Sequence, residues 1–561
     1  LLADLSIRQD LSALTKGLAA EASVSFDNIG GMNETTNKEY RYMNSNASIT
    51  SDGTLVTTPA IYGTDSETLG HTQPFERLML RSDFQAKVDY NRTFGKHQVG
   101  GALIYDMQSV VKNGRNNSQK NQSVLVNATY TYDNRYSLNA VFNRSGSAYL
   151  PDGDKYSNYP AVSAAWIVSN EAFMEKVTPI NLFKIRASYG LSGWDGNLSH
   201  ELWRQSYGSG GAGYNFGVNA GGQSGGSEGD LPVIGLVAEK SQKATFGFDL
   251  AAFDNRLNAT VEGFYEKRSD ILVSGANSTS GIIGITVGQV NEGIYKYKGV
   301  DASLSWNDKI GDFHYGIGAS MSYLNTEVVN VNQAYQEYDY LYTKGNRIGQ
   351  MYGLEAIGFF NSQQEINNSP QQTFSDVAPG DVKYKDQNGD NRIDEKDIVK
   401  MFGSSVPRFY FGFNLNFSYK RLELSADFQG MTGVTVSLLN SPLYSPLVSN
   451  GNISNTFLNE EISWTPENKT NATMPRLTTQ ENLNNYRASS LWYRDGSFLK
   501  LRNLLVAYTF PKSQTRFADL KVFVQGTNLF SLDNIHFADP EQLGIAYPST
   551  RSYWAGIKLN F

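Results

Sequence analysis

The chain of 561 residues contains no cysteine. Disulfide bonds, thiolate nucleophiles and cysteine-ligated zinc sites are therefore excluded. The formal net charge of −7 disfavours a general nucleic-acid binder, because such proteins carry basic surfaces. The five histidines are scattered without the spacing of a zinc site or a catalytic dyad. No catalytic constellation stands out, so we expect a protein that is not an enzyme.

Long hydrophobic runs are missing as well. No stretch of about 18 apolar residues occurs, so we expect no helix that spans a membrane. The first residues, LLADLSIRQD, lack the basic start and apolar core of a signal peptide, so we expect a mature product or a fragment. Proline is scarce at 16 residues, whereas 52 glycines, 33 tyrosines and 30 phenylalanines disfavour ordinary α/β architecture.

The clearest pattern in the sequence is an alternation of apolar with polar or small residues. It is sharpest in RFYFGFNLNFSYKRLELSADFQG, residues 408–430, where every second residue from Phe409 to Tyr419 is apolar. After a short turn at Lys420-Arg421 the alternation resumes from Leu422 to Phe428. A period of two predicts a β-hairpin with one apolar face. Strands of about ten residues are long enough for a tilted strand to cross a bilayer.

Similar pairs occur at 123–146, 243–270, 298–325 and 498–530, within about sixteen or seventeen candidate strands. Short turns alternate with long polar connections such as 28–72, 199–240 and 325–381. This asymmetry is typical of an outer-membrane barrel. A sheet of this size either curls or closes, and a soluble sandwich would need more and shorter strands. We therefore expect an all-β, transmembrane antiparallel β-barrel in contact with outer-membrane lipid.

Two details accompany this expectation. The chain ends in RSYWAGIKLNF, an alternating strand with a final aromatic residue, Phe561, as outer-membrane barrels commonly have. The glycine-rich segment 206–230 contains one match to the phosphate-binding pattern G-x-G-x-x-G and one match to the nucleophile pattern G-x-S-x-G. Its glycine content alone produces such matches, and neither follows a strand and opens a helix. We expect a flexible extracellular loop there.

The stretch DVKYKDQNGDNRIDEKD, residues 381–397, has the ligand spacing of a calcium loop. The candidate ligands are Asp386, Asn388, Asp390, the carbonyl of Arg392, Asp394 and Asp397. An EF-hand sensor is disfavoured, because Asn391 replaces the usual glycine, Asp397 replaces the longer glutamate, and a strand rather than a helix is expected before the loop. The two remaining alternatives are a structural calcium turn and a hydrogen-bonded Asx turn.

The tract YQEYDYLYTKGNRIGQMYG, residues 335–353, concentrates aromatic and polar groups. Flat rings with hydrogen-bonding tips suit sugar or peptide surfaces, and a packed loop is the equal alternative. The candidate ligand contacts are Tyr335, Tyr338, Tyr340, Tyr342 and Tyr352.

Several motifs carry a resemblance to a known family. The run from Gly380 to Gly430 resembles the D-x-N-G-D-x-x-I-D loop and following P-x-[FY]-x-[FY]-G-F hairpin of SusC/RagA-type TonB-dependent transporters. Further similar segments follow in family order from about residue 75 onward: YPAVSAAW (159–166), KIRASYG (184–190), GQMYGLEAIGFFNSQQEI (349–366), WTPEN (464–468), PRL (475–477), FLKLRN (498–503) and QGTNLF (525–530).

The resemblance implies a barrel of about 22 strands plugged by an N-terminal domain. Residues 1–561 would supply the barrel portion with its long extracellular loops, and the plug, the TonB-contact segment and the first strands would lie outside the chain. It implies import of oligosaccharides or peptides, energised through TonB, with a SusD-like surface lipoprotein as lid. The location would be the outer membrane of a Gram-negative, Bacteroidetes-type bacterium.

Two other functions stay open at this point. One is a passive porin, which needs neither a partner nor energy. The other is a barrel that serves as one component of a larger surface assembly. The residues by themselves indicate only a large outer-membrane barrel.

Overall fold

The computed structural model describes residues 2–32, 34–50, 54–72, 75–112, 118–214, 223–277, 282, 284, 287–439, 462–478, 482–535, 538–543 and 549–560. The fold is all-β, as expected from the sequence. In the part of the chain that the structure describes, the short helices are α1 (Gln363–Asn367) and α4 (Lys512–Thr515), with 3₁₀ turns η2 (Val168–Asn170), η3 (Ala172–Met174), η5 (Asp339–Leu341) and η6 (Glu395–Asp397). Among the described residues, no helix is long and apolar enough to cross a membrane.

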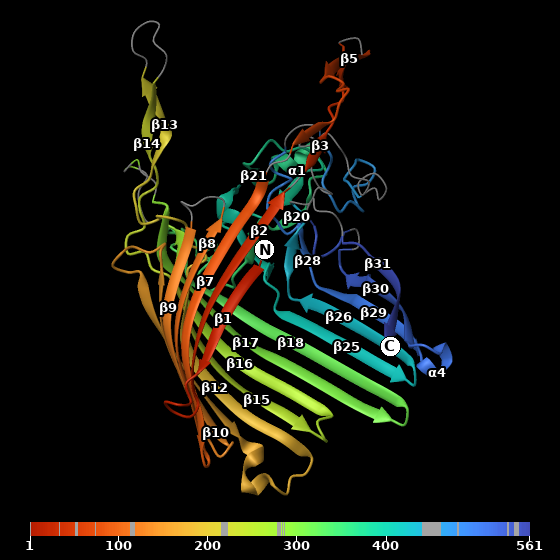
Figure 1. Ribbon diagram of the computed structural model, residues 1–561. Helices are drawn as coiled ribbons and strands as arrows, with labels where there is room; N and C mark the ends of the chain where they lie inside the picture. Colours follow the sequence, from red (N-terminus) through yellow and green to blue (C-terminus); the bar gives the residue numbers. More distant parts are fainter. Residues whose placement is uncertain are drawn as a thin grey trace.

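Among the described residues, one antiparallel sheet of 17 strands dominates, in agreement with the expected sixteen or seventeen (Figure 1). Each strand pairs with the next one along the chain, so the sheet is a simple meander. Its strands are β1 (Leu2–Asp10), β2 (Leu18–Met32), β7 (Phe75–Phe94), β8 (His97–Lys112), β9 (Ser118–Tyr132), β10 (Tyr136–Ser147), β11 (Tyr156–Ile167), β12 (Ile180–Trp194), β15 (Glu239–Ala252), β16 (Leu257–Ser274), β17 (Gln289–Ile310), β18 (Phe313–Asn330), β25 (Phe409–Tyr419), β26 (Leu422–Thr432), β29 (Phe498–Phe510), β30 (Asp519–Asp533) and β31 (Ser552–Asn560).

The short turns at one end of the sheet use residues that tolerate a left-handed backbone. Asp133 and Asn134 join β9 to β10 with φ of 51° and 53°, the conformation that a tight I′ hairpin requires. Lys420 has φ of 54° at the β25–β26 turn, where the sequence predicted it. Gly311, with φ of 60°, joins β17 to β18. Local turn chemistry therefore sets the register of these hairpins.

The two faces of the sheet differ as the alternation predicts. On β9 to β11, one face presents exposed apolar side chains, including Val126, Leu138, Phe142 and Val162. The register stacks them across strands, with Phe142 opposite both Val126 and Pro160. A continuous apolar face of this kind suits contact with lipid.

The opposite face of the sheet is polar. Lys184 contacts Asp249 at 3.2 Å, Arg186 pairs with Glu262, and the hydroxyls of Ser188 and Thr245 lie 2.8 Å apart. These residues come from β12, β15 and β16, so the ion pairs run from strand to strand. A sheet with lipid-type and polar faces is the wall of a transmembrane barrel.

The connections are strongly asymmetric. Short turns such as 95–96, 311–312 and 420–421 lie at one end of the sheet, and long connections such as 331–408 and 433–497 lie at the other (Figure 1). Several strands exceed the ten or so residues that the sequence suggested; β7 has 20 and β17 has 22. A bilayer needs only about 9–11 residues per strand, so the long strands continue beyond it.

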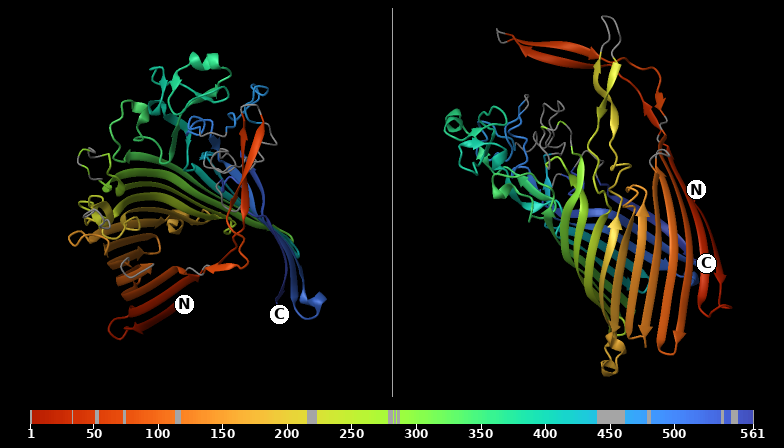
Figure 2. Two further views of the ribbon diagram at one scale, coloured as in Figure 1. Left: turned by 90° about the horizontal axis from the view of Figure 1, so that it is seen from above. Right: turned by 90° about the vertical axis from the view of Figure 1, so that its left-hand side faces the viewer.

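The sheet curls into an open trough, seen from above in Figure 2. Among the described residues, β1 pairs with β2 alone and β31 with β30 alone. The closure expected from the strand number is thus not made by these strands. In a meander of 17 strands the first and last run in the same direction, so a direct β1–β31 contact would be parallel. Antiparallel closure requires an odd number of further strands.

The long connections carry short two-stranded ladders of their own. These pair β3 (Thr35–Asn37) with β6 (Gly70–Thr72), β4 (Tyr42–Ile49) with β5 (Leu55–Tyr62), β13 (Tyr207–Tyr214) with β14 (Gln223–Glu228), β19 (Gln350–Gly353) with β24 (Val399–Ser404), β20 (Ala356–Phe359) with β22 (Val382–Tyr384), β21 (Gln371–Gln372) with β23 (Arg392–Ile393) and β27 (Thr435–Ser437) with β28 (Tyr493–Asp495). The glycine-rich segment forms the β13–β14 hairpin; its residues 215–222, like Phe561, lie outside the described residues.

Two folded units stand on the long-connection end. One has a core of Tyr149, Leu150, Leu198, Val233, Leu236 and Ala238. The other, here named the cap, comprises residues 331–408 together with 433–439, 462–478 and 482–497. The β4–β5 and β13–β14 hairpins project beyond the end of the sheet on the same side (Figure 2).

The two-faced wall makes a testable prediction at neighbouring residues of β11. Val162→Lys places a charge on the apolar face and is expected to cost about 2–4 kcal/mol of stability in a bilayer. Ser163→Lys places the same charge on the polar face, next to Ser188, and is expected to cost much less. Urea unfolding of the whole protein in lipid bilayers measures both. Equal losses would mean that the faces are wrongly assigned.

Candidate functional site

The cap is built from two connections that are far apart in the sequence. Leu354, Val382, Tyr384 and Ile393 form one core within residues 331–408. Leu438, Met474 and Trp492 form a second core within the following connection. Leu491 packs against both cores, so the two connections fold as one body.

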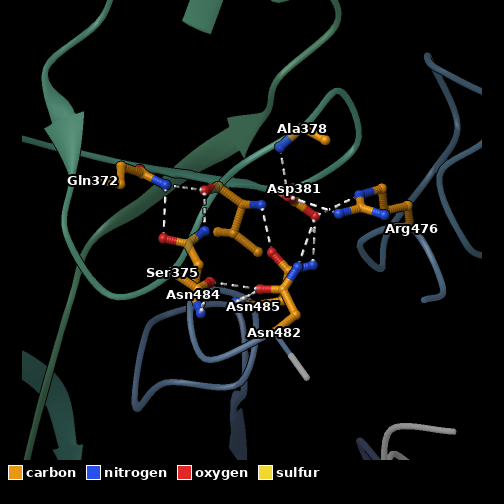
Figure 3. Close-up of polar contacts among 9 residues, drawn as sticks. Gln372, Ser375, Ala378, Asp381, Arg476, Asn482, Asn484 and Asn485 are labelled. Carbon is orange, nitrogen blue, oxygen red and sulfur yellow. Dashed lines mark hydrogen bonds and ion pairs between the residues drawn. The ribbon is translucent and has the colours of Figure 1, made fainter. Parts of the chain in front are cut away.

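The carboxylate of Asp381 is the centre of the contact between the connections (Figure 3). It has no exposed surface. Arg476 donates Nε to Oδ1 at 2.7 Å and Nη2 to Oδ2 at 3.1 Å. The side-chain amides of Asn482 and Asn485 donate to Oδ1 at 3.0 and 2.9 Å, and the backbone N–H of Ala378 donates to Oδ2 at 2.7 Å. A buried charge is tolerated when it is paired and fully hydrogen-bonded, as it is here.

A second set of amide contacts continues from this charge pair. Gln372 donates Nε2 to the side-chain oxygen of Asn484 and to the carbonyl of Val382, both at 2.8 Å. Asn484 donates Nδ2 to the same carbonyl at 3.0 Å. The hydroxyl of Tyr384 donates to the carbonyl of Asn484 at 2.7 Å, and burial raises the pKa of Tyr384 far above its ordinary value. These directional bonds fix one arrangement of the two connections.

The Asp-rich stretch 386–397 follows β22, so the strand expected before it is confirmed. It is a series of side chain-to-backbone turns in which each candidate ligand with a side-chain oxygen accepts at least one N–H. The bonds are Gly389 N to Asp386 Oδ1 (2.7 Å), Asn391 N to Asp386 Oδ2 (2.8 Å), Asp390 N to Asn388 Oδ1 (3.1 Å), Arg392 N to Asp390 Oδ1 (2.9 Å), Lys396 N to Asp394 Oδ1 (2.8 Å), Gln387 N to Asp397 Oδ1 (2.8 Å) and Asp394 N to Asp397 Oδ2 (2.9 Å).

Asn391 takes the place of the usual glycine of a calcium loop with φ of 62°, a conformation that asparagine tolerates. In the described ranges, no three His, Asp or Glu side chains are grouped closely enough to hold a metal ion. The observed geometry is that of an Asx-turn series, whose oxygens each keep a second lone pair. Calcium binding at this loop stays a prediction.

The five candidate tyrosines divide into two kinds. Tyr342 and Tyr352 are part of the cap framework, because the Tyr352 hydroxyl donates to the Tyr342 carbonyl at 3.1 Å. Tyr338 and Tyr340 stack on each other, with ring centroids 5.3 Å apart and planes 13° from parallel. Tyr335 is 85% exposed. Of the five, Tyr335 is exposed, whereas Tyr338, Tyr340, Tyr342 and Tyr352 are half-buried.

The structure brings the two predicted sites together. The Tyr340 hydroxyl donates to the carbonyl of Lys396 at 2.7 Å. Lys396 Nζ lies 2.8 Å from a Glu337 carboxylate oxygen, and this hydrogen bond raises the pKa of Lys396. The aromatic pair therefore rests on the Asp-rich loop. Sequence spacing did not indicate this contact, since about 55 residues separate the two partners.

Sequence reasoning missed the buried network around Asp381. A signal was present, because Asp381 and Arg476 both fall within the family-like segments GDVKY and PRL. The three asparagines, Asn482, Asn484 and Asn485, lie in an ordinary polar run without a pattern. Only folding shows that these amides point at one carboxylate and its neighbouring strand.

No family model matches the chain. In sequence it is similar to a TonB-dependent receptor of Formosa agariphila, 28% identical over 461 residues that cover 77% of this chain and 45% of the relative. A second receptor of the same organism is 26% identical over 546 residues, covering 84% and 51%. The TonB-dependent receptor SusC of Bacteroides thetaiotaomicron is 22% identical over 467 residues, covering 77% and 43%. The chain thus spans about half the length of the curated relatives it matches.

Among solved structures, the RagAB peptide transporter is similar, with a TM-score of 0.73 and 18% identity over 97% of this chain and 60% of the other. A likeness at this identity shows the fold. The fold is that of an outer-membrane β-barrel, and in sequence the chain is similar to TonB-dependent receptors. The similarity to SusC and to the RagAB structure agrees with the SusC/RagA-type motifs of the sequence.

The buried ion pair makes a testable prediction about the cap. Arg476→Ala leaves the Asp381 carboxylate buried without its partner and is expected to destabilise the cap by about 3–5 kcal/mol. Lys385→Ala is the control, because Lys385 and Glu355 are 49% and 43% exposed and such pairs are worth about 1 kcal/mol or less. Hydrogen exchange of residues 372–384 reads out the cap separately from the barrel. Unchanged exchange in Arg476→Ala would contradict the assigned role.

The calcium prediction can be tested on the same loop. If the second lone pairs bind Ca²⁺, backbone amides of residues 386–397 exchange more slowly in Ca²⁺ than in EGTA. Asp390→Ala, which removes an exposed candidate ligand, is expected to abolish the difference, and Mg²⁺ serves as the control ion. Identical exchange with and without Ca²⁺ would leave the Asx-turn series as the complete description.

Proposed function

We propose that the protein containing this chain imports oligosaccharides or peptides across the outer membrane, energised through TonB, together with a SusD-like surface lipoprotein. Its polar-walled, 17-stranded sheet with an ordered cap at the long-connection end carries the proposal. A lipid-type outer face and a polar inner face suit a path for hydrophilic solutes.

The relatives support this proposal without choosing the ligand. One solved relative is described as a peptide transporter, and the sequence relatives are described as TonB-dependent receptors. We assign the plug, the TonB-contact segment and the remaining strands to the portion of the relatives' length that this chain does not span. Residues 1–561 then form the barrel portion, in the outer membrane of a Gram-negative, Bacteroidetes-type bacterium.

In this mechanism the ligand is captured between the barrel mouth and the lipoprotein lid, and TonB then remodels the plug to release it inward. The cap is suited to the mouth because its shape is fixed by the Asp381–Arg476 pair. Rigid elements position contact residues more accurately than mobile loops do. The Tyr338–Tyr340 stack lies on this rigid body.

The passive porin is the alternative function, and uptake separates the two. Cells carrying the protein are given labelled oligosaccharide and peptide pools with and without a protonophore. TonB-dependent import stops when the proton-motive force is dissipated, whereas passage through a porin continues. Native mass spectrometry of the complex from its own membranes gives the second readout. Bound lipoprotein without any uptake would favour a role as an assembly component.

The aromatic pair makes a testable prediction within this proposal. Replacing Tyr338 and Tyr340 together by alanine is expected to weaken ligand binding more than about tenfold, or about 1.4 kcal/mol. The physical reason is the loss of a flat apolar surface with polar tips. Tyr207→Ala is the control, since Tyr207 is 73% exposed on the separate β13–β14 hairpin. Unchanged affinity of the double variant in equilibrium binding would remove these residues from the ligand site.

A further inference from the structure

Three lysines lie close together on one face of β16 and β17, and they are here named the lysine cluster. Lys267 of β16 is directly opposite Lys296 of β17, and Lys298 is two residues further along the same face of β17. Directly opposed residues have Cβ atoms about 5 Å apart, so two like charges there destabilise a sheet. Among the described residues, none of the three ammonium groups forms an ion pair, whereas that of Lys240 on β15 contacts a carboxylate at 3.0 Å. Glu327, opposite Lys296 on β18, is one carboxylate beside three lysines, so the cluster keeps a positive charge.

The strand register assigns the lysine cluster to the lipid-type face. From Val162 on the apolar face of β11, directly opposed pairs lead across the sheet through Tyr189, Ala244 and Tyr265 to Lys298. Residues directly opposite each other share a face, so Lys298 and Val162 lie on the same side of the sheet. Tyr265, the neighbour of Lys298, is 46% exposed. Exposed tyrosines on this face are typical of the boundary between lipid and water.

The strand below the cluster has the length of one bilayer crossing. Beyond Lys298, the side chains of β17 on the lipid-type face are Val300, Ala302, Leu304 and Trp306, before the next charge at Asp308. Residues 299–307 match the about 9–11 residues that a tilted strand needs to cross a bilayer. Asp308 then lies at the short-turn interface and the lysine cluster at the long-connection interface. Long connections of outer-membrane barrels are extracellular, so the cluster lies at the level of the outer leaflet.

An apolar groove lies on the same strands, next to the cluster. It has a volume of about 710 Å³, and Lys298 is part of its lining. Gly263 hollows its centre, because this residue is directly opposite both Phe246 and Val300 and places no side chain between them. A Cβ atom at Gly263 would meet no atom closer than 3.9 Å, so the space is open. The other lining side chains of the lipid-type face are Ala244, Phe248, Val261, Tyr265 and Tyr323.

We propose that the groove and the lysine cluster bind a phosphorylated acyl lipid of the outer leaflet. An acyl chain lies in the groove over Gly263, and the phosphate lies between Lys267 and Lys296. The phosphate removes the repulsion between the two opposed ammonium groups, and lysine binds phosphate as a point charge. The acyl chain fills a hollow in a face that contacts lipid. This proposal rests on the outer-membrane fold and is independent of the proposed import.

Other occupants fit these observations less well. β16 and β17 lie in the middle of the meander, away from β1 and β31, where further strands would join (Figure 1). A plug inside a barrel meets the polar face and not the lipid-type face. Free phosphate would neutralise the lysines but leave the apolar groove unfilled. A protein partner above the membrane would not reach the groove, which continues toward the hydrocarbon core beside Val300.

The test uses the complete protein isolated from its own outer membranes and stripped of lipid in detergent. Phosphorylated lipid A, an outer-leaflet lipid of Gram-negative bacteria, is added, and native mass spectrometry measures the fraction of protein that binds it. We expect the triple variant Lys267→Gln/Lys296→Gln/Lys298→Gln to bind at least about tenfold more weakly than the wild type. Replacing the same three lysines by arginine should retain binding, because the charge is kept. Dephosphorylated lipid A should bind to the wild type at least about tenfold more weakly than the phosphorylated form.

Two further variants separate the charge from the groove. The control for net charge is a triple exchange of exposed lysines at the short-turn end, which should leave binding unchanged: Lys309→Gln/Lys420→Gln/Lys512→Gln. Gly263→Leu fills the groove without changing any charge and should also weaken binding about tenfold, while Gly95→Leu is not used because its φ of 59° would strain the backbone. Heat-modifiable migration on gels confirms that each barrel is folded.

Defined results would overturn the proposal. Equal binding of lipid A by the glutamine triple variant and the wild type would remove the lysine cluster from the site. Equal binding of phosphorylated and dephosphorylated lipid A would leave an apolar contact only. Inorganic phosphate that displaces phosphorylated lipid A at equal concentration would indicate an anion site without a lipid. Loss of a bound protein from the triple variant, with lipid A binding unchanged, would reassign the cluster to a protein interface. Failure of solute uptake would count against the proposed function alone.

Discussion

The pairing of backbone hydrogen bonds in lipid is the constraint on which this molecule depends. An unpaired N–H or C=O group in the hydrocarbon region costs several kcal/mol, so a strand survives there only with a partner on each side. Fifteen of the 17 strands meet this condition through the meander alone. The β1 and β31 edges are the two exceptions among the described residues, and both run in the same direction. Complete antiparallel pairing therefore demands an odd number of strands between them.

That constraint also explains where variety is permitted. Inside the sheet, each residue must serve either the lipid-type or the polar face, so the strands are regular and ion pairs on the polar face link one strand to another. Beyond the bilayer, water satisfies backbone groups, and long connections can fold into units with their own cores. The parts of the chain that differ from the repetitive sheet therefore lie at the long-connection end. The cap and the β4–β5 and β13–β14 hairpins all lie there, above a wall whose chemistry is repetitive.

The cap illustrates how such a connection becomes rigid without secondary structure. Its strands are two to six residues long, too short to be stable by pairing alone. Asp381 replaces that missing stability with a fully hydrogen-bonded charge, and amide side chains extend the contact to Tyr384. Because each of these bonds is directional, the network selects one arrangement of two connections that lie about 95 residues apart. The Asp-rich loop and the Tyr338–Tyr340 stack belong to the same cap and contact each other through the Tyr340–Lys396 hydrogen bond.

The sequence by itself determined the elements that depend on neighbours in the chain. The period-two alternation of residues 409–428 and the turn at Lys420 predicted a hairpin that the structure confirms residue by residue, and the same reasoning counted the strands correctly. The tertiary structure alone decided which distant groups meet. It placed Arg476 on Asp381 and Tyr340 on Lys396, joined Tyr352 to Tyr342, and left the sheet open where closure was expected. The physical reason is that alternation and turns are local properties of a chain, whereas these contacts depend on how several chain segments pack at once.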